Sequence, residues 1–170
     1  GSYFLQVGGA FSHNQAGTNG GAVYWETNRP FGALRSSTFQ FDYITMTHNV
    51  AGGGGGGMYV NGTLVNDGAW ASLTHNRILS NTAQGIDVDN THGGGIFLDK
   101  MATNGSTVYF NRNILQNNKA GEGFGGSGGG ARLGDIDSSD VEIKGNQIVE
   151  NTTTDSGGGL HIGKVSKGSL

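Results

Sequence analysis

A motif that recurs five times along the 170 residues predicts an all-β fold, a right-handed parallel β-helix (solenoid) of about five coils with three parallel sheets. Three observations support this prediction. The stretch FSHNQAGTNGGAVY, from Phe11 to Tyr24, returns as MTHNVAGGGGGGMY, from Met46 to Tyr59. Apolar residues on both sides of each copy alternate with the period of two that is typical of strands. Glycine, with 34 residues, and asparagine occupy fixed places in the repeat, which is typical of regular tight turns.

The first strand of each repeat precedes the motif. It carries two apolar residues spaced two apart, as in Phe39 and Phe41 or Val108 and Phe110, whose side chains share one face. A unit this short cannot bury that face alone. We therefore expect equivalent strands to stack in parallel around a narrow apolar core, with about 4.8 Å between coils.

Each repeat is anchored on an apolar residue that is followed three positions later by asparagine. Asparagine tolerates left-handed backbone, bonds to its own turn, and can bond to identical amides along a stack. We therefore expect one column of five asparagines at a corner of the solenoid: Asn14, Asn49, Asn81, Asn118 and Asn151. In the last three repeats a further asparagine lies two residues before the anchor, at Asn76, Asn113 and Asn146.

A glycine pair leads into the last strand of each repeat. Glycine supplies the positive φ, or the tight corner, that a β-carbon would forbid. The five pairs are Gly20 and Gly21, Gly55 and Gly56, Gly93 and Gly94, Gly128 and Gly129, and Gly157 and Gly158. In the strand that follows we expect one inward column, made of Val23, Met58, Ile96, Ala131 and Leu160.

The length indicates one domain over residues 1–170, with repeats at about 4–36, 37–69, 70–105, 106–139 and 140–170. Longer loops are expected at 26–37, 61–70, 85–90 and 121–128. Loops on a rigid scaffold often carry recognition, and drift in tolerated surface loops is the alternative for each. Neither terminus resembles a cap, so we expect either a segment of a longer solenoid or a subunit that stacks end to end into a filament.

Composition narrows the classes of partner. A net charge of −3 provides no basic surface for nucleic acid. The chain has no cysteine, so it offers neither a disulfide framework nor a thiolate metal site. No stretch approaches the roughly 20 apolar residues of a membrane-spanning helix, so we expect no membrane span in this chain.

The outward positions of the last strand suggest a binding surface. In the expected register they are Tyr24, Tyr59, Phe97, Arg132 and His161. Stacked coils would place three aromatic rings in a ladder beside a cation, which suits a polysaccharide or a protein partner. The alternative is that the ladder stabilises the sheet through contacts between neighbouring rings.

Two sets of residues invite a metal interpretation. His13, His48 and His75 each lie in a [ST]-H-N triplet, but the alignment places His75 in a different column, so we interpret all three as turn residues. Asp87 with Asp89, and Asp135 with Asp137, carry the oxygen ligands that calcium prefers. Neither pair matches a known calcium loop, so we expect no cofactor and at most weak calcium binding at Asp87 and Asp89.

Catalytic signatures are sparse. Enzymes that cleave polysaccharides use clustered or paired carboxylates. The outward column of the first strand is Gln40, Ser72, Tyr109 and Glu142, which contains one acid. The glycine run 52–57 lacks the Lys-Ser/Thr that completes a phosphate-binding loop. We therefore expect a non-enzymatic role and keep a fragment of a polysaccharide lyase or hydrolase as an alternative.

The paired FxxN and GGA[ILV] motifs, here Phe11 to Asn14 and Gly20 to Val23, resemble the repeats of the chlamydial polymorphic outer membrane protein family. The resemblance extends from roughly Phe4 to Ile162. It implies a β-helical passenger of autotransporter type, extracellular or exposed at a cell surface. The expected function is then adhesin-like binding to host, cell-surface or polysaccharide partners, with an end-to-end filament as the structural alternative.

Overall fold

The computed structural model describes residues 3–27, 38–85, 91–121 and 125–170. These residues form strands and turns without a helix, so the prediction of an all-β fold is confirmed. Within them there is accordingly no helix long and apolar enough to cross a membrane. Every pair of neighbouring strands is parallel, as the stacking argument requires.

The strands form three sheets, as predicted. Sheet A has eight strands: β1 (Tyr3–Ser12), β4 (Thr38–Thr47), β7 (Trp70–Thr74), β8 (Arg77–Leu79), β11 (Thr107–Asn111), β12 (Ile114–Gln116), β15 (Asp140–Lys144) and β16 (Gln147–Val149). Sheet B has five: β2 (Gln15–Ala16), β5 (Val50–Ala51), β9 (Thr82–Ala83), β13 (Lys119–Ala120) and β17 (Thr152–Thr153). Sheet C has six: β3 (Val23–Glu26), β6 (Met58–Val65), β10 (Ile96–Thr103), β14 (Ala131–Asp137), β18 (Leu160–Ile162) and β19 (Val165–Ser166).

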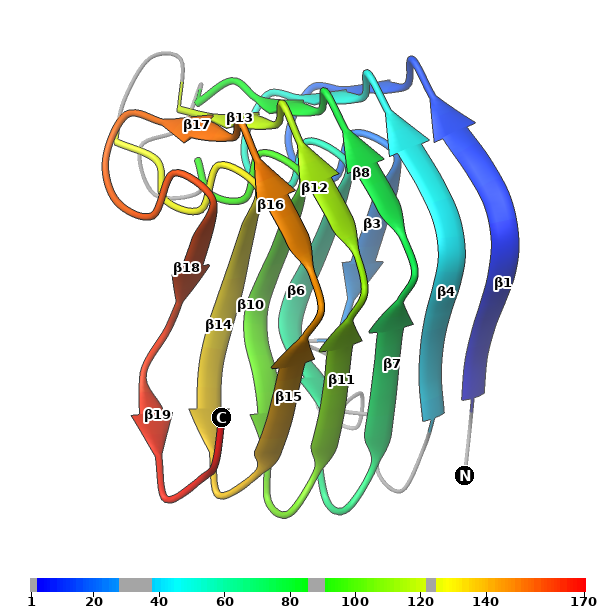
Figure 1. Cartoon of the computed structure of the whole chain (residues 1–170), viewed down its shortest axis with the longest axis vertical. Helices are drawn as coiled ribbons and strands as arrows, with labels where there is room; N and C mark the ends of the chain where they lie inside the picture. Colours follow the sequence, from blue (N-terminus) through cyan, green and yellow to red (C-terminus); the bar gives the residue numbers. More distant parts are fainter. Residues whose placement is uncertain (1–2, 28–37, 86–90, 122–124) are drawn as a thin grey trace.

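The path of the chain is a right-handed solenoid (Figure 1). In that view the chain rises along sheet A at the front, crosses sheet B at the top and descends along sheet C at the back. It advances from the N-terminus on the right to the C-terminus on the left. Each of the five repeats contributes to all three sheets, so four steps separate the first coil from the last.

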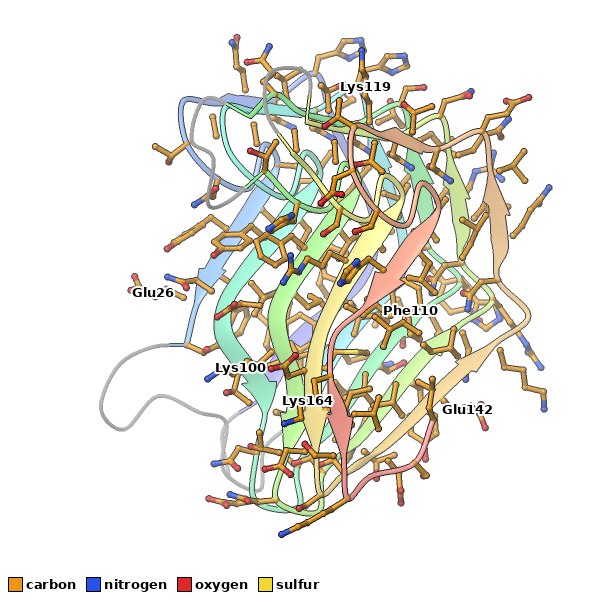
Figure 2. The ribbon with its side chains drawn as sticks, turned by 90° about the vertical axis from the view of Figure 1, so that its left-hand side faces the viewer. Glu26, Lys100, Phe110, Lys119, Glu142 and Lys164 are labelled. Atoms are coloured by element: carbon orange, nitrogen blue, oxygen red, sulfur yellow. The ribbon has the colours of Figure 1, made fainter. Side chains whose placement is uncertain are left out.

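The register agrees with the alignment of the repeats. Val23, Met58, Ile96, Ala131 and Leu160 pair in that order across sheet C and form the predicted inward column. Their side chains pack with those of sheet A in one apolar core that fills the centre of the solenoid. Phe110 of β11, which points inward, is fully buried there (Figure 2). At the N-terminal end Phe4 stacks on Phe39 at 5.1 Å.

The asparagine column is a continuous hydrogen-bond ladder. Asn81 illustrates it: its side-chain Nδ2 donates to Oδ1 of Asn118 in the next coil at 3.0 Å and to the backbone oxygen of Met46 in the previous coil at 3.0 Å. The backbone N of Asn81 also donates to Oδ1 of Asn118, at 3.0 Å. The left-handed residue is not the asparagine itself but the one before it, as at His48 with φ 55°. The residue before the asparagine therefore forms the tight corner, and the asparagine side chain hydrogen-bonds to the backbone and side chains of the neighbouring coils there.

The two glycines of each pair meet different constraints, as expected. Gly55 has φ +64°, which favours a residue without a β-carbon. Gly56 lies against the next coil, so that a β-carbon there would be 2.1 Å from the backbone oxygen of Gly94. The same close approach recurs at Gly94, where the neighbouring oxygen belongs to Gly129. The glycine pairs thus permit both the corner and the close packing of successive coils.

Sheet C extends further than the sequence indicated, which corrects the prediction of a loop at 61–70. Strand β6 continues to Val65, and Leu64 and Val65 are buried in the core. The register shifts between Leu98 and Lys100 of β10 opposite β6, where Gly62 has φ +93°. This bulge interrupts the alternation of apolar side chains and hides the strand from a period-two pattern. The other predicted loops lie partly or wholly outside the described residues.

Candidate functional site

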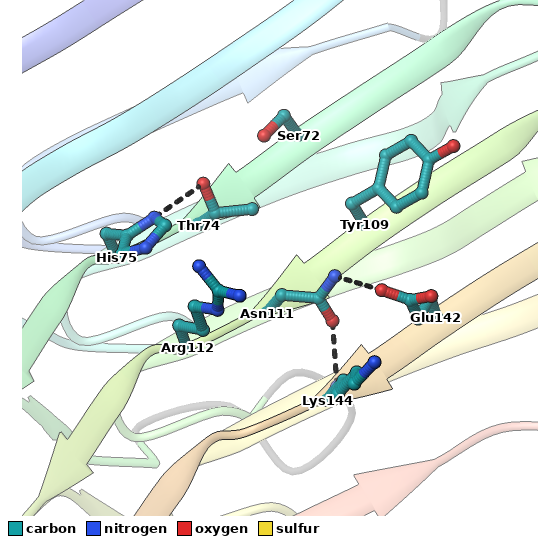
Figure 3. A pocket seen from close by; sticks show the side chains of 8 residues that line it. All are labelled: Ser72, Thr74, His75, Tyr109, Asn111, Arg112, Glu142 and Lys144. Carbon is teal, nitrogen blue, oxygen red and sulfur yellow. Dashed lines mark hydrogen bonds between the residues drawn. The ribbon is translucent and has the colours of Figure 1, made fainter.

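A shallow groove on the outward face of sheet A is the candidate site (Figure 3). It has a volume of about 220 Å³ and crosses three coils, at β7, β11 and β15. In these strands Leu73 and Phe110 point into the core, so the neighbours on either side of each one in its strand face outward. This sheet A groove is lined by Ser72, Thr74, His75, Tyr109, Asn111, Arg112, Glu142 and Lys144. Parallel pairing holds β7, β11 and β15 in fixed register across the groove.

A buried carboxylate supports the floor of the groove. Asp42, in β4, is 5% exposed. Its Oδ1 accepts hydrogen bonds from Ser72 Oγ at 2.7 Å, Thr74 N at 2.8 Å and Thr74 Oγ1 at 2.9 Å, and its Oδ2 accepts one from Gln40 Nε2 at 2.8 Å. Four donors offset the cost of burying this carboxylate. Because the hydroxyl hydrogens of Ser72 and Thr74 point inward to Asp42, the lone pairs of Ser72 Oγ remain as acceptors.

This network also orients His75. Thr74 Oγ1 donates to Asp42, so it accepts from Nδ1–H of His75 at 3.2 Å. The neutral ring then has no hydrogen on Nε2, which is an acceptor. The His75 ring stacks on Tyr43, with 4.6 Å between centroids and 7° between planes. The ring is therefore held by a hydrogen bond at one edge and by an aromatic face beside it.

Asn111 holds Glu142, the only carboxylate among the described residues that line the groove. Its Nδ2 donates to Oε1 of Glu142 at 2.5 Å, and its Oδ1 accepts from the backbone N of Lys144 at 2.8 Å. Arg112 follows directly in the turn after β11, where φ is 55°. Among the residues that the structure describes, no carboxylate forms an ion pair with Arg112 or Lys144. Glu142 is thus held by the Asn111 amide, while Arg112 and Lys144 beside it remain available to bind a ligand.

Aromatic faces are exposed on the same side of the solenoid. Tyr109 lines the groove and is 41% exposed. Trp70, which pairs with Thr107 two residues before Tyr109, is also 41% exposed. Tyr109 and Glu142 further line an adjoining depression of about 650 Å³, together with Thr107 and Asp140. The polar and aromatic surface is therefore longer than the groove itself.

The predicted outward column on sheet C is present, but its aromatic residues are mostly covered. Tyr24, Tyr59, Phe97, Arg132 and His161 pair in that order. Tyr24 is 49% exposed, whereas Tyr59 is 4% and Phe97 3% exposed. The rings of Tyr59 and Phe97 lie 4.7 Å apart and are tilted by 43°, and burial raises the pKa of Tyr59 to about 12. Of the three rings, only Tyr24 therefore presents a broad aromatic face to solvent.

A polar cluster at the edge of this column did not appear in the sequence pattern. His92 Nδ1 accepts a hydrogen bond from the backbone N of Ser127 at 3.1 Å, and Ser127 Oγ lies 3.1 Å from the same atom. Arg132 Nη1 donates to Ser127 Oγ at 3.2 Å. Burial, aided by the charge of Arg132, lowers the pKa of His92 to about 4. His92 is therefore neutral at pH 7, and with so low a pKa it is a weak base for activating Ser127.

The remaining predicted sites stay dispersed. His13 and His48 share a column and stack at 5.1 Å, while His75 belongs to the column of Tyr43, as the alignment indicated. Oδ1 of Asp135 accepts from the backbone N of Lys164 at 2.9 Å. The described part of the chain holds no group of three or more His, Cys, Asp or Glu side chains placed to bind a metal ion. Asp87 and Asp89 lie outside the described residues.

The sheet A groove combines residues that the sequence had placed in separate patterns. Its column of Ser72, Tyr109 and Glu142 was expected, but the two cations and the support from Asp42 were not. Arg112 and Lys144 are far apart in sequence and meet only through the stacking of β11 on β15. Comparison with known proteins adds no relative to this description: no family model matches the chain, and no curated protein or solved structure does.

Proposed function

We propose that this protein is a non-enzymatic, extracellular or cell-surface β-helix that binds a polysaccharide in the sheet A groove, in the manner of an adhesin. The observation that carries the proposal is the exposed ring of Tyr109 among hydrogen-bonding groups on a rigid sheet. A tyrosine ring offers an apolar face to the C–H face of a sugar, while its rim and neighbours stay polar. Ser72, Asn111 and Glu142 surround it in fixed register.

The length of the surface suits a polymer. Neighbouring strands lie about 4.8 Å apart, so the three coils of the groove span about 10 Å. Together with the depression beside Tyr109, the surface extends past one sugar ring. Because the sheet is built from stacked coils, the spacing between strands repeats along the axis of the solenoid, as sugar units repeat along a polysaccharide.

The acid groups favour binding over cleavage. Glycoside hydrolysis uses two carboxylates that face the scissile bond. In the groove Glu142 is held by Asn111, and Asp42 lies beneath the floor with four donors around it. Asp42 is therefore not positioned to act on a bound sugar. Asp140, which lines the adjoining depression beside Glu142, accepts a hydrogen bond from Ser169 Oγ, so each carboxylate of this surface already has a partner.

Titration of the purified chain with a panel of polysaccharides, followed by calorimetry or affinity electrophoresis, tests the proposal. Tyr109→Ala should weaken binding at least about tenfold, because it removes the exposed ring. Tyr24→Ala is the matched control, since Tyr24 is 49% exposed on sheet C. Loss of binding in Tyr24→Ala alone would move the site to sheet C. Release of new sugar ends from any member of the panel would contradict the non-enzymatic assignment.

A further inference from the structure

From the charges around Tyr109 we infer that the polysaccharide bound in the sheet A groove is anionic and carries carboxylate or sulfate groups. The inference rests on the proposed function and specifies its ligand class. The described residues that line the groove include two basic side chains, Arg112 and Lys144, and one acidic side chain, Glu142. Two of the three are cations, although the chain as a whole has a net charge of −3.

The fold holds the two cations together. The backbone N of Arg112 donates to the backbone oxygen of Lys144 at 2.8 Å, which places the two residues side by side in neighbouring coils. In Figure 3 the guanidinium of Arg112 lies between His75 and Asn111, and Lys144 lies beyond Asn111. Arg112 presents a planar fork of donors that matches a carboxylate or a sulfate, and Lys144 adds a mobile point charge.

The negative groups nearby are already engaged. Glu142 accepts from Asn111, and Asp42 accepts four hydrogen bonds beneath the floor. Asp140, in the adjoining depression, accepts from Ser169 Oγ. Within the described residues none of these acids is paired with Arg112 or Lys144. Both basic side chains therefore lack a carboxylate partner among the described residues, and an anionic ligand supplies the opposite charge.

An aromatic ring and two hydrogen-bond acceptors complete a site for an acidic sugar. Tyr109 offers its ring face, while Ser72 Oγ and His75 Nε2 offer lone pairs to sugar hydroxyl groups. A sugar matches this arrangement when its hydroxyl groups face Ser72 and His75 and its charged substituent faces Arg112. The chemistry recognised is thus a sugar polymer that carries regularly spaced anions.

The test uses two pairs of polymers, and the two members of each pair share a sugar backbone but differ in charge. Polygalacturonate is compared with its methyl-esterified form, and dextran sulfate with dextran. The anionic member of at least one pair should bind about tenfold more tightly than its neutral partner at low salt. Raising NaCl from about 50 mM to about 500 mM should remove most of that advantage, because the ions screen an exposed site. The first pair reports carboxylate recognition and the second sulfate recognition.

Variants locate the charge effect. Arg112→Gln and Lys144→Gln should each reduce binding of the anionic polymer about fivefold or more, and should reduce binding of its neutral partner by a clearly smaller factor. Arg112→Lys should restore part of the affinity, since it keeps the charge and loses the fork. Lys100→Gln is the matched control, because Lys100 lies in β10 of sheet C, across the solenoid from Glu142 (Figure 2).

The outcomes separate this inference from the proposed function. Equal binding within both pairs of polymers, with no effect of Arg112→Gln or Lys144→Gln, would overturn the anionic ligand and leave polysaccharide binding intact. Equal losses in Lys100→Gln and Lys144→Gln would show an unspecific charge effect and would overturn it too. Absence of binding to all four polymers and to the wider panel would overturn both.

Discussion

Removal of one interior member of the asparagine ladder should destabilise the whole solenoid. Asn118 is fully buried, and its side chain makes four hydrogen bonds. Its Oδ1 accepts from the backbone N and the Nδ2 of Asn81, both at 3.0 Å. Its Nδ2 donates to the backbone oxygen of Ile78 at 2.7 Å and to Oδ1 of Asn151 at 2.9 Å. Asn118→Ala removes all four bonds while the residues around them stay buried.

The expected loss follows from the groups left without partners. In Asn118→Ala the backbone N of Asn81 and one hydrogen of its Nδ2 lose their acceptor. Each buried donor without a partner costs about 1–3 kcal/mol, so the two donors of Asn81 together cost about 2–6 kcal/mol. A domain of this size is stable by about 5–15 kcal/mol, so the free energy of unfolding should fall by a large fraction.

Urea unfolding measured by circular dichroism, with linear extrapolation to water, gives this free energy. Asn14→Ala is the control from the same ladder, because Asn14 is exposed and its side chain donates one bond, to Oδ1 of Asn49. Asn14→Ala should lower the free energy of unfolding by about 1 kcal/mol or less. A loss below about 1 kcal/mol in Asn118→Ala, or equal losses in the two variants, would refute the view that the buried ladder sets the stability.

Two further predictions concern glycine and histidine. Gly94→Ala should cost about 3 kcal/mol or more, or prevent folding, because its β-carbon would lie 2.3 Å from the oxygen of Gly129. Gly158→Ala, where the nearest atom is 3.3 Å away, should cost under about 1 kcal/mol in the same denaturation assay. Stability should also fall as pH decreases from about 6.5 to about 4, because the pKa of His92 is lowered to about 4 in the folded chain and unfolding lets the ring take up a proton. The loss is about 2 kcal/mol at most, since the ring is only partly buried, and none accrues below pH 4, where both states are protonated. His92→Gln should remove this contribution, and an unchanged pH profile in that variant would contradict it.

Local rules in the sequence were enough to predict the coils. Each repeat carries its own turn residues and its own alternation, so aligning the repeats predicts which residues pair, as Val23 with Met58 shows. The role of each glycine pair followed from the absence of a β-carbon. The alternation failed at Gly62, where a bulge shifts the register and the strand continues to Val65. A period-two pattern cannot follow a strand through such a shift.

The sequence alone therefore predicts the stack: the five repeats, the three sheets and the residues that share a column. How much of a column reaches solvent, and which columns meet, depends on the tertiary structure. Phe97 faces outward in register, yet the His92 ring at 5.4 Å and the guanidinium of Arg132 at 5.4 Å cover it. Arg112 and Lys144 meet in one groove because β15 stacks on β11. Period and spacing specify backbone pairing, whereas exposure and the clustering of charge depend on side chains that arrive from other coils.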